Sequence, residues 1–232
     1  MSNKIQVELQ EIYGTDKHVA EAAWTSSLTY QGKQKRTEED VSRVVHMLAD
    51  AKHSTPFESI IFRWWIRMPI AIDRQFMTHR LQSASGMSGR YRTMPTDFLG
   101  IPDDIKTITK KVYGSDAGEH IINQYSVFCE SANDFYIAVC NKSKYEKERQ
   151  TITNDEYKRI REFFRGVLPQ HNMTERVSVM NLRSWCNFYR LRSKNDAQPE
   201  IREVANLMMQ EIKKHENIKN TINALEKNNF II

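Results

Sequence analysis

The sequence has few cysteines, and none of them has the spacing of a disulfide or metal motif. It contains three Cys among 232 residues, an odd number without any CxxC pair, and its seven His are isolated from one another. A disulfide framework needs paired cysteines and a structural zinc site needs clustered Cys or His, so both are disfavoured. We expect no metal, and a protein of a reducing compartment such as the cytoplasm.

Long apolar runs are also missing. No stretch approaches the roughly 20 apolar residues that cross a bilayer, and the mean hydropathy is -0.64. The first ten residues lack the apolar core and cleavage site of a signal peptide. With only 8 Gly, 6 Pro and 10% aromatic residues, the composition is that of a folded chain. We expect one soluble domain over residues 1–232, without a membrane segment.

Positive charge is in modest excess and is spread along the chain. Thirty-four Lys and Arg against 29 Asp and Glu give a net charge of +5, with an isoelectric point near 9.0. This balance favours anionic partners, and the absence of one long basic run favours small phosphorylated ligands over nucleic acid. No GxGxxG, GxxxxGK[ST], HExxH or GxSxG motif is present, which disfavours Rossmann, P-loop, zinc-protease and serine-hydrolase sites.

Hydrophobic periodicity predicts a mixture of helices and strands without a regular βαβ rhythm. The fold class is therefore α/β of the mixed, α+β kind. Thr37 and Asp40 resemble a capping box at the start of a helix. We expect strands at 3–9, 60–68 and 177–179, a turn at 14–16, helices after Thr37 and at 121–139, 157–164 and 201–212, and an exposed loop at 141–154.

The segment Arg74–Arg92 is rich in side chains that can bind anions. It holds four Arg, one His, three Ser and two Gly. Hydroxyl groups and glycines in a loop can direct backbone N–H groups toward an anion, and Arg80 and Arg90 can add bidentate contacts to a phosphate. A solvated polar loop is the alternative interpretation.

Two other segments combine polar and apolar side chains. Residues 53–58, HSTPFE, place His, Thr and Glu in one tight turn, which is also the pattern of an ordinary helix stop followed by Pro. Residues 181–193 carry Arg183 and Asn187, which stand one turn apart if the segment is helical. Polar groups in such an apolar segment either hydrogen-bond within the core or meet a ligand.

The segment Thr78–Tyr91, THRLQSASGMSGRY, resembles the signature of the flavin-dependent thymidylate synthases (ThyX). That signature reads Arg-His-Arg, two residues, Ser, one, Asn-Glu, one, Ser, one, Arg-Tyr. Three further segments are similar to family segments in the same order: HSTPFESIIFRWWIRMPIAIDRQF, RGVLPQ and NLRSWCNFYRLRSKNDAQPEI. The signature positions that match are His79, Arg80, Ser83, Ser88, Arg90 and Tyr91.

The resemblance implies a ThyX-like fold with a mixed, largely antiparallel sheet flanked by long helices. It implies a homotetramer whose active sites are shared between subunits. The expected reaction is reductive methylation of dUMP to dTMP, in which methylenetetrahydrofolate gives the one-carbon unit and NADPH reduces FAD. The partner would be a pyrimidine deoxynucleotide monophosphate.

The resemblance also assigns roles to positions of this sequence. Arg192 and Ser88 would be catalytic, with Arg192 stabilising negative charge on the pyrimidine in place of a cysteine nucleophile. The positions expected to line the flavin are His53, Thr55, Glu58, Thr78, His79, Arg80, Asn181, Arg183 and Asn187. The positions expected to hold the nucleotide are Gln75, Gly86, Ser88, Gly89, Arg90, Arg165 and Arg192.

Three departures from the signature leave alternatives open. Thr78, Ser85 and Gly86 stand where the family has Arg, Asn and Glu. One hypothesis is that Thr78 and Gly86 mark a charge pair lost together. A second is an enzyme acting at C5 of another pyrimidine nucleotide, by methylation of dCMP or by hydroxymethylation. A third is a non-catalytic relative that binds nucleotides or nucleic acid.

Overall fold

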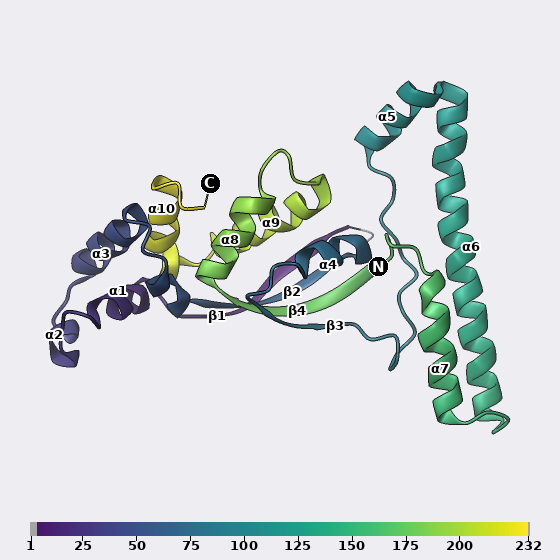
Figure 1. Ribbon diagram of the computed structural model, residues 1–232, viewed down its shortest axis with the longest axis horizontal. Coiled ribbons are helices and arrows are strands. Elements are labelled where there is room, and N and C mark those ends of the chain that lie inside the picture. The colour runs from purple at the N-terminus through teal and green to yellow at the C-terminus, as the bar shows by residue number, and fades with distance from the viewer. Residues whose placement is uncertain (1–3, 232) are drawn as a thin grey trace. The chain divides into compact units, whose positions relative to one another are not determined.

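The structure is a computed structural model that describes residues 4–231 (Figure 1). Strands and helices mix in the order β1 (Gln6–Tyr13), α1 (Asp16–Trp24), α2 (Tyr30–Gln34), α3 (Glu38–Asp50), η1 (Thr55–Ser59), β2 (Ile61–Pro69), α4 (Ile70–Phe76), β3 (Ser83–Gly86), α5 (Asp103–Tyr113), α6 (Ser115–Glu148), α7 (Asn154–Phe164), η2 (Arg165–Val167), β4 (Met173–Asn181), α8 (Leu182–Arg192), α9 (Pro199–Ile212), η3 (Glu216–Ile218) and α10 (Lys219–Lys227). The mixed α/β class is confirmed.

Contacts divide the chain into two compact units. The first, here called the sheet unit, comprises residues 5–67, 74–85 and 175–231. The second, here called the helical unit, comprises Lys4, Met68–Asp73 and Gly86–Thr174. The single-domain organisation expected from the sequence stays a prediction.

The sheet has four strands in the order β1-β2-β4-β3. β1 and β2 run antiparallel, with a register shift between Leu9 and Glu11. Side chains alternate along β2, because successive residues of a strand point to opposite faces. Phe62, Trp64 and Ile66 are fully buried, and Phe62 packs edge-to-face against Trp185 of α8. In Figure 1, α8 and α9 cover one face of the sheet. The strands expected at 60–68 and 177–179 correspond to β2 and to a longer β4; the first strand lies later than expected, and residue 3 is outside the described residues.

Two carboxylates fix helix ends in the sheet unit. Thr37 and Asp40 form the expected capping box, since each side chain accepts from the other's backbone N–H at 3.2 Å. Asp16, at the start of α1, accepts hydrogen bonds from the backbone N–H of Asn220 (3.1 Å) and of Thr221 (2.8 Å). Asp16 therefore caps the N-terminus of α10, a helix about 200 residues away along the chain.

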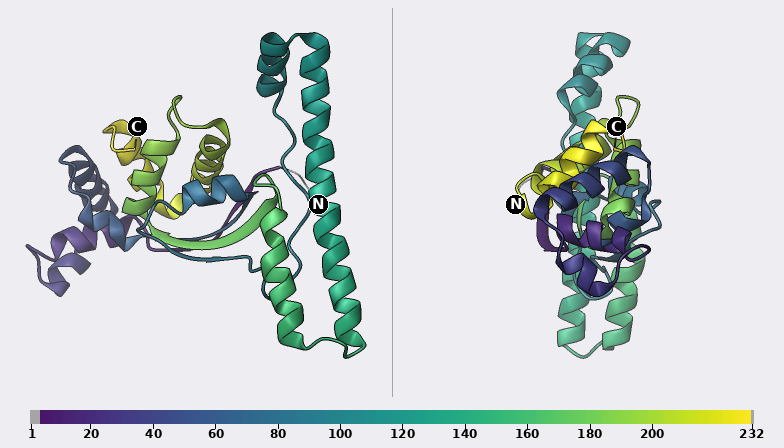
Figure 2. Two further views of the ribbon diagram at one scale, coloured as in Figure 1. Left: turned by 45° about the vertical axis from the view of Figure 1, so that its right-hand side comes forward. Right: turned by 90° about the vertical axis from the view of Figure 1, so that its left-hand side faces the viewer.

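The helical unit is built around α6, with α5 and α7 packed along it (Figure 2). Tyr136 and Cys140 of α6 and Leu168 form its buried core. Asn133 of α6 forms a reciprocal amide pair with buried Asn172, whose Nδ2 donates to Asn133 Oδ1 at 2.7 Å. These contacts satisfy the polar groups that the packing of α6 buries.

The prediction of a loop at 141–154 is wrong for residues 141–148, which are helical. α6 continues to Glu148, and only residues 149–153 separate it from α7. Polarity suggested a loop, but Lys142–Glu146 and Lys144–Glu148 are ion pairs four residues apart, an arrangement that supports an exposed helix. α7 itself begins at a second capping box, formed by Thr153 and Glu156.

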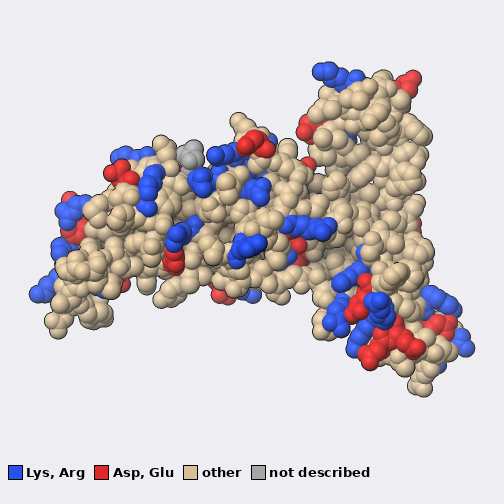
Figure 3. Space-filling model, in the orientation of Figure 1, with Lys and Arg blue, Asp and Glu red and all other residues tan. Residues whose placement is uncertain are grey.

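The apolar stripe of α6 is largely exposed. Ile121, Phe128 and Phe135 stand at seven-residue intervals and are 40%, 70% and 49% exposed. On α5, Ile108 and Val112 are exposed as well. The sequence has no Lys or Arg between Lys111 and Lys142, and this part of the surface is mostly tan in Figure 3, whereas the α6–α7 end carries both charges. Among the described helices, none is long and apolar enough to cross a membrane.

Candidate functional site

Helix α8 presents the polar residues that the sequence singled out near the C-terminus. Asn181 caps it, because its Oδ1 accepts from Ser184 N at 2.8 Å. Leu182 N donates to Ile60 O at 2.8 Å, which fixes the start of α8 beside the start of β2. The segment is helical, so Arg183 and Asn187 stand one turn apart, which is the arrangement considered in the sequence.

An ion pair connects α8 to the HSTPFE turn. Arg183 donates to Glu58 Oε1 at 2.6 Å. The two side chains are 46% and 40% exposed, so water screens the pair and it adds little to stability. It does bring together two of the residues expected to line a flavin.

In the sheet unit, the side chains of His79 and Arg192 are joined by a hydrogen bond. Arg192 Nε donates to His79 Nε2 at 3.0 Å, so the ring accepts at Nε2 and carries its proton on Nδ1. Phe188 packs edge-to-face on the ring, with the two centroids 4.9 Å apart. Burial, and secondly the Arg192 charge, lower the pKa of His79 below 6.5. The imidazole is therefore neutral at neutral pH.

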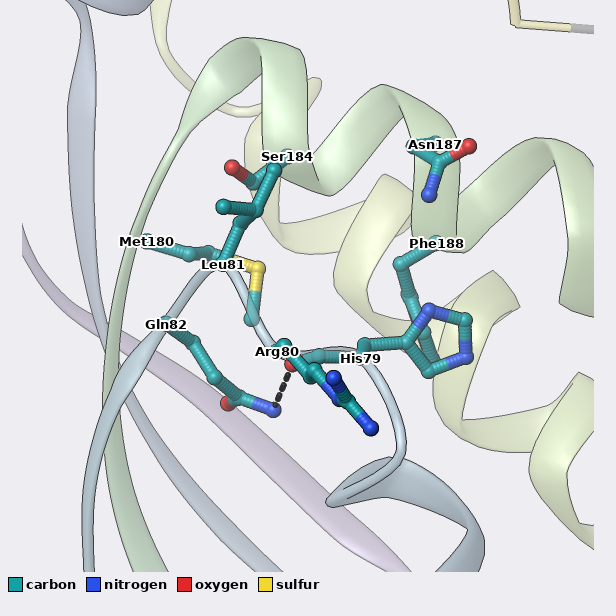
Figure 4. Close-up of a pocket in the computed structure, with 8 residues that line it drawn as sticks. All are labelled: His79, Arg80, Leu81, Gln82, Met180, Ser184, Asn187 and Phe188. Atoms are coloured by element: carbon teal, nitrogen blue, oxygen red, sulfur yellow. Dashed lines mark hydrogen bonds between the residues drawn. The ribbon is translucent and has the colours of Figure 1, made fainter.

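His79 and Phe188 border a small pocket of about 50 Å³. In Figure 4, the His79 ring lies against Phe188, and the side chain of Asn187 projects from α8 beside Phe188. Drug-sized ligands occupy pockets of roughly 300 Å³ or more, so this pocket admits only the edge of a larger molecule. Its lining residues are His79, Arg80, Leu81, Gln82, Met180, Ser184, Asn187 and Phe188.

Gln75 and Thr78 lie at the end of α4. Gln75 Nε2 donates to the side chain of Gln198, at the start of α9. Thr78 Oγ1 donates to Gln75 O at 2.7 Å, so the hydroxyl that replaces the family's Arg caps the helix. The coupling of Thr78 to Gly86 stays a hypothesis.

Two expected flavin residues lie apart from the pocket of Figure 4. His53 borders a different pocket of about 410 Å³, together with Trp24, Met47 and Pro56. Thr55 is exposed at the start of η1. The structure thus brings together Glu58 with Arg183, and His79 with Arg80, Asn187 and Arg192.

The remaining nucleotide residues lie in the helical unit. Gly89 is buried against Arg165, and a Cβ at Gly89 would lie 2.8 Å from Arg165 Cδ. A side chain there would push Arg165 away, so this close approach needs glycine. Ser88 Oγ accepts from Arg90 N at 3.3 Å, which leaves its hydroxyl proton to donate. Gly86 is exposed at the end of β3.

Helix α7 holds Arg90 from two sides. Arg161 donates to Arg90 O at 2.6 Å, and Glu162 forms an ion pair with the Arg90 guanidinium. Arg90 and Arg165 both belong to this end of the helical unit, and each offers several N–H donors suited to a phosphate. An incoming phosphate would compete with Glu162 for Arg90.

Several of these contacts were missed in the sequence. Gln82 occupies a variable position of the signature, and Arg161 and Gln198 match no motif considered above. Ser178 of β4 donates to the side chain of Gln82. The sequence does indicate this buried hydroxyl, because the alternation along β4 places Ser178 on the same face as Met180, which is buried. A buried hydroxyl requires a partner.

Comparison with known proteins decides the family. The profile of Thy1, described as thymidylate synthase complementing protein, matches residues 8–216. The chain belongs to this family. The Thy1 match confirms the ThyX resemblance seen in the sequence.

The Thy1 relatives include named enzymes. The chain is 32% identical over 207 residues to a flavin-dependent thymidylate synthase of Kosmotoga olearia, covering 86% of this chain and 81% of the relative. It is 27% identical to the flavin-dependent thymidylate synthase of Thermus thermophilus, covering 89% and 71%. These relatives agree with the expectation of an enzyme.

A solved structure confirms the fold. The UMP/dUMP methylase PolB from Streptomyces cacaoi, bound with 5-Br dUMP, superposes with a TM-score of 0.76, and the match covers 97% of this chain and 96% of PolB. At 23% identity this likeness establishes a shared Thy1 fold.

Proposed function

We propose that this Thy1 protein is a flavin-dependent methyltransferase of the cytoplasm that converts dUMP to dTMP. The observation that carries the proposal is the pairing of Arg192 with neutral His79. Within residues 4–231, Arg192 has no carboxylate partner. Its remaining N–H groups are therefore available to an anion, and a fixed cation in a partly buried site stabilises negative charge well.

The donors in the sheet unit fit a flavin. Arg183, Asn187 and the neutral His79 combine a cation, an amide and a ring donor, which suit the polar edge and the diphosphate of FAD. His79, Arg80, Asn181, Arg183 and Asn187 would hold it, with Glu58 orienting Arg183. Bound there and reduced by NADPH, FAD would supply the hydride that completes the methyl group.

This chain's own residues bind and polarise the nucleotide. Arg90 and Arg165 would hold the 5′-phosphate, and Ser88 would donate to the nucleotide. Gln75 would contact it from the end of α4. Arg192 would stabilise negative charge as C5 of the uracil forms a bond to the one-carbon unit of methylenetetrahydrofolate. The carbon–nitrogen bonds that hold this unit to the folate would break, and the C5 proton would pass to solvent.

The three buried cysteines are unsuited to an alternative nucleophilic mechanism. Cys129, Cys140 and Cys186 are at most 5% exposed, and burial raises the pKa of each thiol. The thiolate is the nucleophilic form, so these residues are inert. Activation by Arg192 needs no such group.

The proposed assembly is a homotetramer with shared sites. Two observations support it: the pocket beside His79 has a volume of only about 50 Å³, and α6 exposes Phe128 and Phe135. Exposed apolar patches of this kind mark interfaces. Light scattering of the purified protein should give four times the mass of the chain, and Phe128→Lys should reduce it. A monomeric wild-type protein would contradict the assembly.

The decisive experiment is an anaerobic assay on purified protein loaded with FAD. Flavin bands should bleach with NADPH and return only when methylenetetrahydrofolate and dUMP are both present. Mass spectrometry should identify dTMP, and [5-³H]dUMP should release its tritium. Protein that retains no flavin and forms no product would refute the proposal and favour the non-catalytic relative.

A different pyrimidine substrate is the second candidate. The changed positions Thr78, Ser85 and Gly86 favour it, because they alter the charge and shape of the signature. The fold neighbour PolB is named as a methylase of UMP and dUMP, so the assay includes UMP and dCMP, with methyl and hydroxymethyl products measured separately. Turnover of one of these above that of dUMP would favour this candidate.

A further inference from the structure

The turn that carries His79 has little regular structure to fix it. It leaves α4 at Phe76 and reaches β3 at Ser83. Its backbone bonds are short-range, such as His79 N to Phe76 O at 3.2 Å and Gln82 N to Arg80 O at 2.8 Å. Met77, Thr78 and Leu81 are exposed and add no buried packing.

The Gln82 side chain spans this turn. Its Nε2 donates to His79 O at 2.9 Å and to Phe76 O at 3.1 Å, so both amide hydrogens bind backbone carbonyls. Figure 4 shows the Gln82 amide directed at the turn, with a hydrogen bond drawn from its nitrogen. A single side chain thus holds the first part of the turn and the residue that carries the imidazole.

Gln82 is itself anchored to the sheet. Ser178 of β4 is fully buried, and its Oγ donates to Gln82 Oε1 at 2.5 Å. With this bond, both N–H groups of the Gln82 amide and one lone pair of its oxygen have partners. Ser178 of β4 therefore holds the Gln82 side chain, and the Gln82 side chain in turn holds the backbone of His79.

The same turn sets where the His79 ring lies. The ring contacts the Nε of Arg192 and the ring of Phe188, and both contacts depend on the position of the His79 backbone. Displacement of a catalytic group by about 1 Å can cost about 100-fold in rate. At metal sites, the outer partners that orient the ligands typically contribute about 10–100-fold to metal affinity or activity, and we expect a comparable effect for a side chain that orients the His79 ring.

We propose that Gln82, anchored by Ser178, is a positioning residue that holds His79 against Arg192. This inference rests on the proposed function for its catalytic consequence, but the placement of the ring can be measured without it. Gln82 would act through His79 and would not contact the substrate.

The test compares Gln82→Met, Gln82→Glu and Ser178→Ala with the wild-type protein. Met keeps the length of the side chain and removes all polar atoms. Glu keeps an acceptor for Ser178 but removes both donors to the turn. The matched control is Gln210→Met, on the exposed surface of α9 in the same unit.

Two readouts separate positioning from mere stability. We expect Gln82→Met and Gln82→Glu to raise the FAD dissociation constant at least 10-fold and to lower kcat about 10–100-fold, with the KM for the nucleotide within threefold. Ser178→Ala should change the FAD dissociation constant and kcat in the same directions, by smaller factors than the two Gln82 variants. Gln210→Met should match the wild type. An unchanged FAD dissociation constant and kcat with a lower melting temperature would overturn the proposal, because Gln82 would then be structural alone.

The second readout is the ¹⁵N NMR spectrum of the His79 ring, assigned with His79→Gln. In the wild type it should show the Nδ1–H tautomer, and in Gln82→Met a mixture of tautomers and a pKa closer to 6.5. If the wild type binds no flavin, the proposed function fails and the spectrum still tests the positioning. Identical ring spectra in wild type and Gln82→Met would overturn it.

Discussion

The two units of this protein differ in how they are built and in what they are expected to bind. The sheet unit gathers three separate stretches of chain and carries all the expected flavin residues. The helical unit is mainly the continuous stretch Gly86–Thr174 and carries Ser88, Arg90 and Arg165. Under the proposed function, residues of the sheet unit polarise the base and residues of the helical unit hold the phosphate.

The largest expected effect is that of Arg192→Ala. It removes the cation beside His79, and loss of one such electrostatic contact lowers kcat about 100–1,000-fold. Stopped-flow and steady-state assays with dUMP measure this fall in kcat. The dissociation constant for dUMP should change less. The control is Lys194→Ala, which removes an exposed cation two residues away. Equal losses in the two variants would contradict a special role for Arg192.

Arg165→Ala should affect nucleotide affinity alone. A charge-assisted hydrogen bond contributes about 1.5–3 kcal/mol, so we expect the KM for dUMP to rise about 10–100-fold with the FAD dissociation constant unchanged. Gly89→Ala should act in the same direction, because its Cβ would lie 2.8 Å from Arg165 Cδ. Binding of deoxyuridine, which lacks the phosphate, should be insensitive to both. Weaker FAD binding in either variant would contradict the proposed division of roles between the two units.

The two capping boxes offer a matched pair of stability variants. Thr37→Ala in α3 and Thr153→Ala in α7 each remove an N-cap hydroxyl, at a cost of about 1 kcal/mol. Differential scanning calorimetry measures the loss. Since α7 holds Arg90, Thr153→Ala should raise the KM for the nucleotide slightly, whereas Thr37→Ala should leave it unchanged. Indistinguishable kinetics would show that α7 tolerates fraying without consequence for Arg90.

The smallest expected effect is a pH dependence from His79. Its pKa is lowered in the folded state, so below about pH 6.5 the unfolded state binds more protons than the folded state. The contribution to stability is full above that pH and is lost as the pH falls through the folded-state pKa. Urea unfolding between pH 5 and 8 should show a flatter profile for His79→Gln. Parallel profiles would assign the dependence to other groups.

Local patterns in the sequence predicted part of the fold and of the site. The Thr37 capping box, the alternation along β2 and the one-turn spacing of Arg183 and Asn187 depend on neighbouring residues, so they could be read directly. Residues 141–148 could not, because an exposed helix held by ion pairs has the composition of a loop.

Other parts of the site depend on tertiary contacts. Gln82 and Ser178 are 96 residues apart, and nothing in either local sequence indicates the other. The seven-residue spacing of Ile121, Phe128 and Phe135 predicted a helix correctly, but burial requires a partner surface, and these side chains are exposed in the single chain. The separation of His53 from the pocket beside His79 likewise follows from the packing of α1 and α3.

The cap that Asp16 provides for α10 has a consequence for the nascent chain. Its partners lie 204 and 205 residues further on, so this contact cannot form until Asn220 and Thr221 have been synthesised. Helices α5, α6 and α7 contact their immediate neighbours and can pack as soon as they emerge, because local contacts form fastest. β1 and β2 must wait for β4, α9 and α10, with their strand edges open to other chains meanwhile. These early strands are therefore the part of the nascent chain that is most open to pairing with other chains.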